Sequence, residues 1–298
     1  PAFAKGDEYK IKPAKNVRPV PKFSRRQQLA RLATTTNHGA FNRNIANRLW
    51  AMMLGRGLVP PVDLHHSDNP PSHPELLEVL ADELSAHKFD IKWMLREFAL
   101  TETYQRSSLL SADAKEPPPE SFAVALERAL SAEQLMDGML AATGERTILL
   151  KQIDEELREA DPKFFDILRA NPDRLSKQRN ERLSEIRQTF VTAFGNVPRE
   201  PEVEFSPTVK ASLFLMNEQT VLGWLERKPG NLVDRLAEIA DSTKLADELY
   251  LSVMSRLPSD EERSEVAKFL TDRKENRDKA IGHLAWALLA STEFRLNH

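Results

Sequence analysis

The amino-acid sequence predicts a mainly α fold, an irregular multi-helix bundle with long proline-rich loops. Apolar residues recur at spacings of three and four from Ser24 onward, which places them on one face of successive helices. No segment alternates apolar and polar residues as a half-buried strand does, and the sequence has no repeat of fixed period. The 19 prolines lie between the periodic segments or at their starts, where helices tolerate them.

Composition excludes several classes of protein. The 298 residues include no cysteine, which excludes disulfides, thiolate zinc sites, cysteine nucleophiles and covalently attached c-type haem. No apolar run approaches the roughly 20 residues that a membrane-spanning helix needs, so we expect no membrane span. Residues 1–31 carry nine bases and two acids, whereas the rest of the chain carries 33 bases and 43 acids. Nucleic acid is therefore not an expected partner, because nucleic-acid-binding domains usually present a basic face on their folded part.

The first elements follow in chain order. Residues 1–22 contain three internal prolines and no helical period, which indicates a basic, proline-rich linker or arm. Leu29 and Leu32 mark the face of a first helix, and the apolar spacing between residues 45 and 53 marks a second. The connection 54–71 has two glycines and four prolines, so we expect a long irregular loop there.

Local patterns predict where later helices begin. Three segments match the capping box, in which a serine and the acid or amide three residues later satisfy each other's backbone amides: Ser72–Glu75, Ser131–Gln134 and Ser259–Glu262. Asp161-Pro162 and Asn171-Pro172 predict interruptions in the charged helical stretch 145–190. The four tryptophans and the Met52-Met53 pair lie on apolar stripes, which predicts that they fill the core.

A proline-rich break at 111–120 divides the helical part of the chain. We therefore expect an N-terminal helical subdomain over 23–110 and a C-terminal helical subdomain over 111–298. Within the second, residues 195–207 predict another long loop, and a helix is expected to start at 206–207.

Several segments together resemble a known family. They are FNRNIANRLWAMMLGRGLVPPVDLHHSDNPPSHPELLEVLADEL at 41–84, TETYQRS at 101–107, LFLMNEQTVLGWL at 213–225, ELYLSVMSRLPSDEE at 248–262 and AWALLASTEFRLNH at 285–298. GRGL, PPSHPELL and TYQRS in this order resemble the domain-of-unknown-function 1553 family of planctomycetes and related bacteria. The resemblance covers nearly everything after residue 24.

The resemblance implies architecture more than chemistry. Such domains form the C-terminal part of large exported proteins, so the resemblance implies an exported chain in the periplasm or cell envelope. In such proteins a companion domain of unknown function often precedes them, and frequently a c-type cytochrome domain as well. The implied partner is therefore an upstream domain of the same polypeptide or another chain of a complex, and the basic arm would be the tether to it. The family supplies no activity to carry over.

A histidine-rich loop is the candidate metal site. Asp63, His65, His66, Asp68 and His73 supply the nitrogen and oxygen donors that zinc or another divalent metal prefers. Their spacing matches no standard zinc motif, and adjacent side chains point apart in extended chain, so at most one of His65 and His66 shares a site with His73. The alternative is a polar loop in which His73 fixes the start of a helix. Apart from this possible metal, we expect no cofactor in the chain.

An arginine and asparagine set is the candidate ligand-binding site. Asn47, Arg48, Arg56 and Arg106 are its members, and Asn44, Asn47 and Arg48 share one helix face. Arginine offers planar, bidentate donors suited to carboxylate, sulfate or phosphate. The same side chains can instead brace the 54–71 loop through its carbonyls and acids. Gly55 and Gly57 are expected to end the helix and to allow a positive φ angle.

These observations favour an accessory or interaction domain of a larger exported envelope protein, which positions a partner redox or substrate-binding domain. The sequence contains neither a GxSxG elbow nor a recognisable catalytic triad, so no motif in it indicates an enzyme with a nucleophilic side chain. The alternative is a metal-assisted hydrolase or lyase acting on anionic polysaccharide, with His73 and Asp63 as ligands or acid–base groups. In that hypothesis Arg48 and Arg56 bind the anion.

Overall fold

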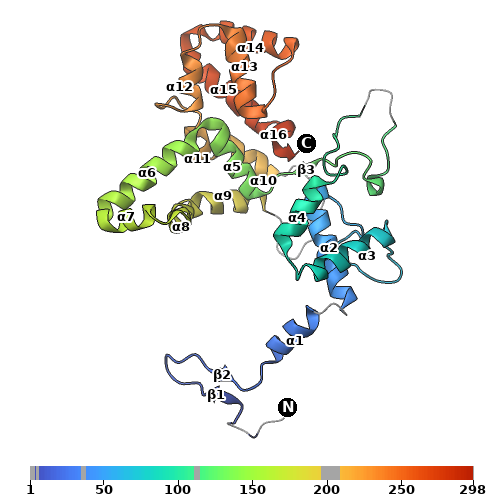
Figure 1. The fold of residues 1–298 in the computed structure, drawn as a ribbon. Coiled ribbons are helices and arrows are strands. Elements are labelled where there is room, and N and C mark those ends of the chain that lie inside the picture. The colour runs from blue at the N-terminus through green and yellow to red at the C-terminus, as the bar shows by residue number, and fades with distance from the viewer. Residues whose placement is uncertain (1–3, 5–6, 35–37, 111–114, 196–208, 298) are drawn as a thin grey trace. The chain divides into compact units, whose positions relative to one another are not determined.

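The computed structural model describes residues 4, 7–34, 38–110, 115–195 and 209–297 (Figure 1). Helices dominate this part of the chain, and its strands are short, which confirms the mainly α prediction. The chain forms two compact units, Pro1–Glu127 and Arg128–Asn297. The division predicted at residue 111 falls on residues 111–114, which lie outside the described residues.

The N-terminal segment folds into short elements that bury no side chain. Strands β1 (Tyr9–Ile11) and β2 (Val20–Pro21) pair antiparallel, and helix α1 (Arg25–Ala33) follows. The Ser24 hydroxyl accepts from the Gln27 amide at 3.2 Å and so caps the helix start. The helix predicted around Leu29 and Leu32 is therefore present, yet both leucines are exposed. The strand pair was not predicted, because a hairpin this short has no clear alternation.

Three helices enclose the core of the first unit. They are α2 (Gly39–Leu54), α3 (Pro74–Ala86) and α4 (Ile91–Leu100), and a short 3₁₀ turn, η1 (Pro119–Ser121), follows. Their apolar faces enclose a core that includes Ala46, Leu49, Trp50, Leu77, Leu84, Met94, Phe98 and Phe122. Met53 packs against this core, but Met52 is 69% exposed, so the prediction that both methionines fill the core is wrong for Met52. The two side chains are about 100° apart around the helix, and only one of them faces α3 and α4.

The capping box predicted at Ser72 is wrong. Helix α3 begins at Pro74 with His73 as its N-cap residue, and no side chain caps it. Ser72 is held outside the helix, since its backbone N–H donates to the Leu58 carbonyl at 2.8 Å. A tertiary contact has overridden a local signal at this position. The capping boxes at Ser131 and Ser259 are confirmed.

Five consecutive helices open the second unit after strand β3 (Arg128–Ala129). They are α5 (Ala132–Thr143), α6 (Glu145–Ala160), α7 (Pro162–Arg169), α8 (Pro172–Arg182) and α9 (Ser184–Phe194). The predicted interruptions are confirmed, because Asp161 and Asn171 cap α7 and α8 and a proline occupies the first turn of each. Helices α6, α7 and α8 share a small core of their own, made of Ile153, Leu157, Phe165, Leu168, Leu175 and Leu183.

The rest of the second unit surrounds a larger core. Its elements are α10 (Val209–Asn217), α11 (Gln219–Gly223), α12 (Leu232–Ala237), α13 (Ser242–Met254), α14 (Asp260–Asp272), the 3₁₀ turn η2 (Lys274–Asn276), α15 (Arg277–Ala290), α16 (Thr292–Arg295) and β4 (Leu296–Asn297). Strand β4 pairs antiparallel with β3. Trp224 is buried, as predicted, and Trp286 is half-buried with its indole N–H donating to the Leu215 carbonyl at 2.9 Å. Of the expected loop 195–207, residues 196–207 lie outside the described residues, and so does the expected helix start at 206–207.

Candidate functional site

Asn47 of α2 organises the loop that follows the helix. The side chain is fully buried, its Oδ1 accepts from the Val59 amide at 3.0 Å, and its Nδ2 donates to the Val59 carbonyl at 2.9 Å. The Asn47 side chain thus satisfies both the backbone N–H and the backbone carbonyl of buried Val59. Each of these groups, left buried without a partner, would cost about 1–3 kcal/mol. Asn47 therefore braces the loop, as the structural alternative predicted.

Two glycines permit this arrangement for different reasons. Gly55 ends α2 with φ 84°, a left-handed conformation that confirms the predicted helix stop. A Cβ atom on Gly57 would lie 2.9 Å from Asn47 Oδ1 and 2.9 Å from the Val59 carbonyl oxygen. Gly57 is thus required for close approach to the asparagine.

Arg48 and Asp63 form an ion pair between α2 and the loop. The Arg48 Nε atom also donates to Asn44 Oδ1 at 3.3 Å, and Asn44 Nδ2 donates to the Val62 carbonyl at 3.4 Å. The side chains of Arg48 and Asp63 are 44% and 71% exposed, so the pair is accessible from solvent. An anion that binds Arg48 must compete with Asp63 for the guanidinium.

His65 completes this part of the site. Its Nε2 lies 3.2 Å from Asn47 Nδ2, which is a donor, so the ring nitrogen accepts and the proton of the neutral ring is on Nδ1. Burial lowers the pKa of His65 below its usual 6.5, and the nearby charges of Arg43 and Arg48 lower it further, while Asp63 opposes them. A ring held neutral has the protonation state that a metal ligand needs, but its Nε2 lone pair is already engaged.

The remaining loop residues form a separate turn. His66 Nδ1 accepts from the Asp68 amide at 3.2 Å, and Asp68 Oδ1 accepts from the Ser67 hydroxyl at 3.4 Å. Asn69 Nδ2 donates to the carbonyls of Pro60 and Leu64 at 3.1 and 2.8 Å. Asn69 therefore fixes the loop from inside, a role that the sequence analysis missed because nothing in the chain marks the carbonyls it reaches.

His73 and Arg106 meet at a residue that the sequence analysis did not select. The His73 ring lies 6.0 Å from the ring of Phe122, and Arg106 Nη1 donates to the Phe122 carbonyl at 2.6 Å. Phe122 also packs edge-on against Trp50, with ring centroids 5.4 Å apart. His73 Nδ1 lies 3.1 Å from the Ser72 hydroxyl. His73 and Arg106 therefore belong to a cluster around Phe122, apart from the contacts that Asn47 makes with Val59 and His65.

No group of three or more His, Asp or Glu side chains that could hold a metal ion occurs in the described residues. Asp63 and His65 lie near Arg48 and Asn47, whereas His66 and Asp68 bond within their own turn and His73 faces Phe122. The five candidate ligands are therefore not gathered around one point, and the metal hypothesis stays a prediction.

Arg56 is the least engaged of the candidate arginines. The residue is half-buried, and its Nε atom is buried with no hydrogen-bond partner among the described residues. Trp50 Nε1 and Asn42 Oδ1, both on α2, are likewise buried without a hydrogen-bond partner among the described residues. These three atoms mark polar positions in the first unit that the periodicity of the sequence did not reveal.

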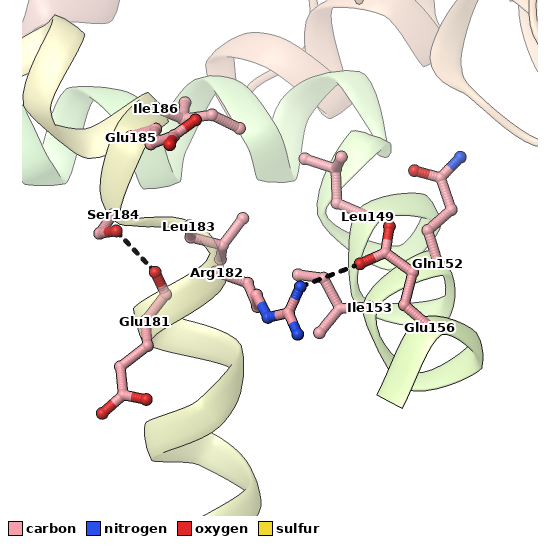
Figure 2. A pocket seen from close by; sticks show the side chains of 10 residues that line it. All are labelled: Leu149, Gln152, Ile153, Glu156, Glu181, Arg182, Leu183, Ser184, Glu185 and Ile186. Atoms are coloured by element: carbon pink, nitrogen blue, oxygen red, sulfur yellow. Dashed lines mark hydrogen bonds and ion pairs between the residues drawn. The ribbon is translucent and has the colours of Figure 1, made fainter. Parts of the chain in front are cut away.

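A hollow of about 360 Å³ lies in the second unit between α6 and the junction of α8 with α9 (Figure 2). Arg182 Nη1 donates to Glu156 at 3.4 Å across it, and the Ser184 hydroxyl donates to the Glu181 carbonyl at 2.6 Å. None of its ten lining residues is a histidine, so no imidazole base stands beside Ser184 there. The hollow therefore offers no nucleophile with a histidine base.

Comparison with known proteins identifies a family whose description names no activity. A family model described as "Protein of unknown function (DUF1553)", also named PSD1, matches residues 25–270, which confirms the resemblance drawn from the sequence. Neither the curated proteins nor the solved structures include a significant match to the chain. Among the helices described, none is long and apolar enough to cross a membrane.

Proposed function

Since the chain belongs to the DUF1553 family, whose description assigns no activity, we propose from its surface that it is an accessory interaction domain. It is part of a larger exported envelope protein and positions a partner domain that carries a redox centre or binds a substrate. The partner is the domain that precedes it in the same polypeptide or another chain of the same complex.

One observation carries this proposal. Residues 7–34, which we call the docking arm, contain two paired strands and a capped helix, yet none of their side chains is buried. Secondary structure this short is marginal in water without a surface to pack on. The arm also exposes six large apolar side chains, Ile11, Val17, Val20, Phe23, Leu29 and Leu32. Exposed apolar groups in this number indicate a surface that a partner covers.

The charge of the arm defines the chemistry of the partner. Eight residues of the arm are lysine or arginine, and two, Asp7 and Glu8, are acidic. A partner surface that fits the arm therefore combines apolar pockets for the leucines with acidic residues around them. Charge of this kind steers association and makes it depend on salt, while apolar burial supplies the affinity.

The candidate polar residues of the first unit support an interaction role over a catalytic one. Asn47 is bonded to Val59 and His65, and Arg48 is paired with Asp63, so these side chains hold the loop in shape. A braced, rigid loop is suited to a contact surface, because little conformational entropy is lost when a partner binds it.

Binding of the 298-residue chain to the separately produced upstream domain of its natural polypeptide tests the proposal. We expect Leu29→Asp with Leu32→Asp to weaken binding at least about tenfold, because burial of each leucine contributes roughly 1.5–3 kcal/mol. Leu109→Asp is the matched control, since Leu109 is 85% exposed and lies outside the arm. Affinity that is absent in the unaltered chain, or equal in the double variant, would contradict the proposal.

A further inference from the structure

Helices α9 and α10 form an exposed groove in the second unit. The groove has a volume of about 700 Å³ and is lined by Glu185, Gln188, Thr189, Thr192 and Ala193 of α9 and by Lys210, Leu213, Phe214, Asn217 and Glu218 of α10 and its C-terminal end. Leu213 lies near its middle and is 52% exposed, and Phe214 lines the groove beside it. The face is therefore apolar at its centre and charged at its ends.

Packed aromatic rings lie behind the groove. Phe214 contacts Phe190 and Phe194, with ring centroids 5.0 and 5.3 Å apart, and Phe190 stacks on Trp224 at 6.1 Å. Phe190 and Trp224 are buried, so these rings anchor both helices to the core of the second unit. A face supported in this way is already shaped for a partner and need not reorganise on binding.

Helix α10 has a basic residue at its N-terminal end and an acidic residue at its C-terminal end. Lys210 lies in its first turn and Glu218 directly follows its last residue, with Leu213 and Phe214 midway between them. A two-fold axis through this midpoint, perpendicular to the helix, brings Lys210 of one copy opposite Glu218 of the other at both ends. The same operation places Leu213 against its own counterpart in the second copy. An isologous interface requires this kind of self-complementarity.

We infer that this face binds a second copy of the chain, with the two α10 helices antiparallel and each seated in the groove of the other. The four helices α9 and α10 from both copies then pack as a small bundle. Antiparallel helices also set their macrodipoles in the favourable orientation. Each copy contributes only one short helix and half of another, so the buried area lies at the small end of the range for protein interfaces. We therefore expect a dissociation constant in the micromolar range, about 1–100 µM. This inference does not depend on the docking arm.

Sedimentation velocity of the 298-residue chain at low salt, over roughly the same micromolar range of concentrations, tests the inference. We expect a concentration-dependent dimer, and Leu213→Asp should weaken it at least about tenfold because two aspartates then face each other across the axis. Met216→Asp is the matched control: Met216 is 58% exposed on the same helix but does not line the groove. A chain that stays monomeric, or a dimer that Leu213→Asp leaves intact, would overturn the inference.

A charge exchange tests the geometry itself. Lys210→Glu and Glu218→Lys should each abolish the dimer, because each homodimer then holds two pairs of like charge. A mixture of the two variants should dimerise, because both pairs of the mixed dimer again join opposite charges. Glu218 also accepts from the Thr220 amide at 3.3 Å at the start of α11, so circular dichroism must first show that Glu218→Lys keeps its helical content. If that variant unfolds, Lys210→Glu mixed with the unaltered chain should dimerise less than the unaltered chain alone. Failure of a folded mixture to dimerise would overturn the antiparallel arrangement.

Discussion

The side-chain nitrogen of Asn47 lies 3.2 Å from Nε2 of His65, so a buried amide on α2 fixes the tautomer of a ring 18 residues later in the chain. The same nitrogen donates to the Val59 carbonyl at 2.9 Å. Both hydrogens of one amide are therefore used to hold the loop after α2 at two separate points. This links the sequence of the helix directly to the shape of the candidate site.

Replacement of Asn47 with alanine should loosen this loop. The Val59 amide and carbonyl would lose their partner inside the protein, and we expect the first unit to lose about 2–5 kcal/mol. The measurement is hydrogen exchange of the Val59 amide, which should become much faster in Asn47→Ala. Asn44→Ala is the control, because its 3.4 Å bond to the Val62 carbonyl is weak and partly exposed. Equal exchange at Val59 in both variants would show that Asn47 does not brace the loop.

The loop should also respond to pH through His65. Because its folded pKa lies below the usual 6.5, the neutral ring contributes stability in full above pH 6.5, and this contribution is lost as the pH falls from 6.5 through the lower folded value. Protonation would place an N–H against the Asn47 amide, where two donors repel. We expect loop amides to exchange faster at about pH 5.5 than at about pH 7.5, after correction for the intrinsic rate.

Two variants separate His65 from the other histidines. In His65→Gln the new amide oxygen can accept from Asn47 and does not titrate, so the excess exchange at low pH should disappear. In His66→Gln it should remain, because His66 bonds only within its own turn among the described residues. A pH response unchanged in His65→Gln would assign it to another group.

Gly57→Ala should destabilise the first unit by about 1–3 kcal/mol, because the added methyl group overlaps Asn47 Oδ1 and the Val59 carbonyl. Thermal unfolding followed by circular dichroism measures the loss. Gly39→Ala is the comparison, since its nearest neighbour would be the flexible Arg43 side chain at 3.7 Å. Equal melting of the two variants would show that the close approach at Gly57 carries no cost.

Local rules predicted the helices well because their signals lie within one turn. Ser131 and Ser259 cap their helices as expected, and Asp161 and Asn171 start α7 and α8 beside a proline. The same rules failed at Ser72, whose amide is bonded to the Leu58 carbonyl across the loop. Spacing places a residue on a face, but only the tertiary fold decides whether that face is covered.

The site was less predictable than the helices. The spacing placed Asn47 and Arg48 on one helix face and suggested that they brace the loop, and the structure has Asn47 bonded to Val59. The roles of Asn69 and Phe122 depend on the path of irregular backbone, which has no periodic signal. For the same reason the five candidate metal ligands looked close in sequence while their contacts divide them in space.

The Arg256 clamp in the second unit provides a last test. Arg256 donates to both oxygens of Glu262 and of Glu293 at 2.6–2.9 Å, and its guanidinium lies 5.2 Å from the centre of the Tyr250 ring. The hydrogen bonds from Arg256 to Glu262, with a smaller contribution from Ser259, lower the pKa of Glu262 from 4.5 to about 2, although burial opposes them. The contribution of Glu262 to stability is therefore complete above pH 4.5 and is lost as the pH falls toward 2.

Arg256→Lys should weaken the clamp, because an ammonium cannot donate in a bidentate manner to two carboxylates at once. The side chain of Arg256 is 39% exposed, so solvent screening limits the expected loss to about 1 kcal/mol near neutral pH. The difference from the unaltered chain should shrink as the pH falls below 4.5, as thermal melts across this range would show. Arg235→Lys is the control, since Arg235 makes one exposed ion pair at 3.5 Å with Glu248 and should change little at any pH. A loss in Arg256→Lys that persists undiminished near pH 2 would assign it to packing on Tyr250 instead of to the carboxylates.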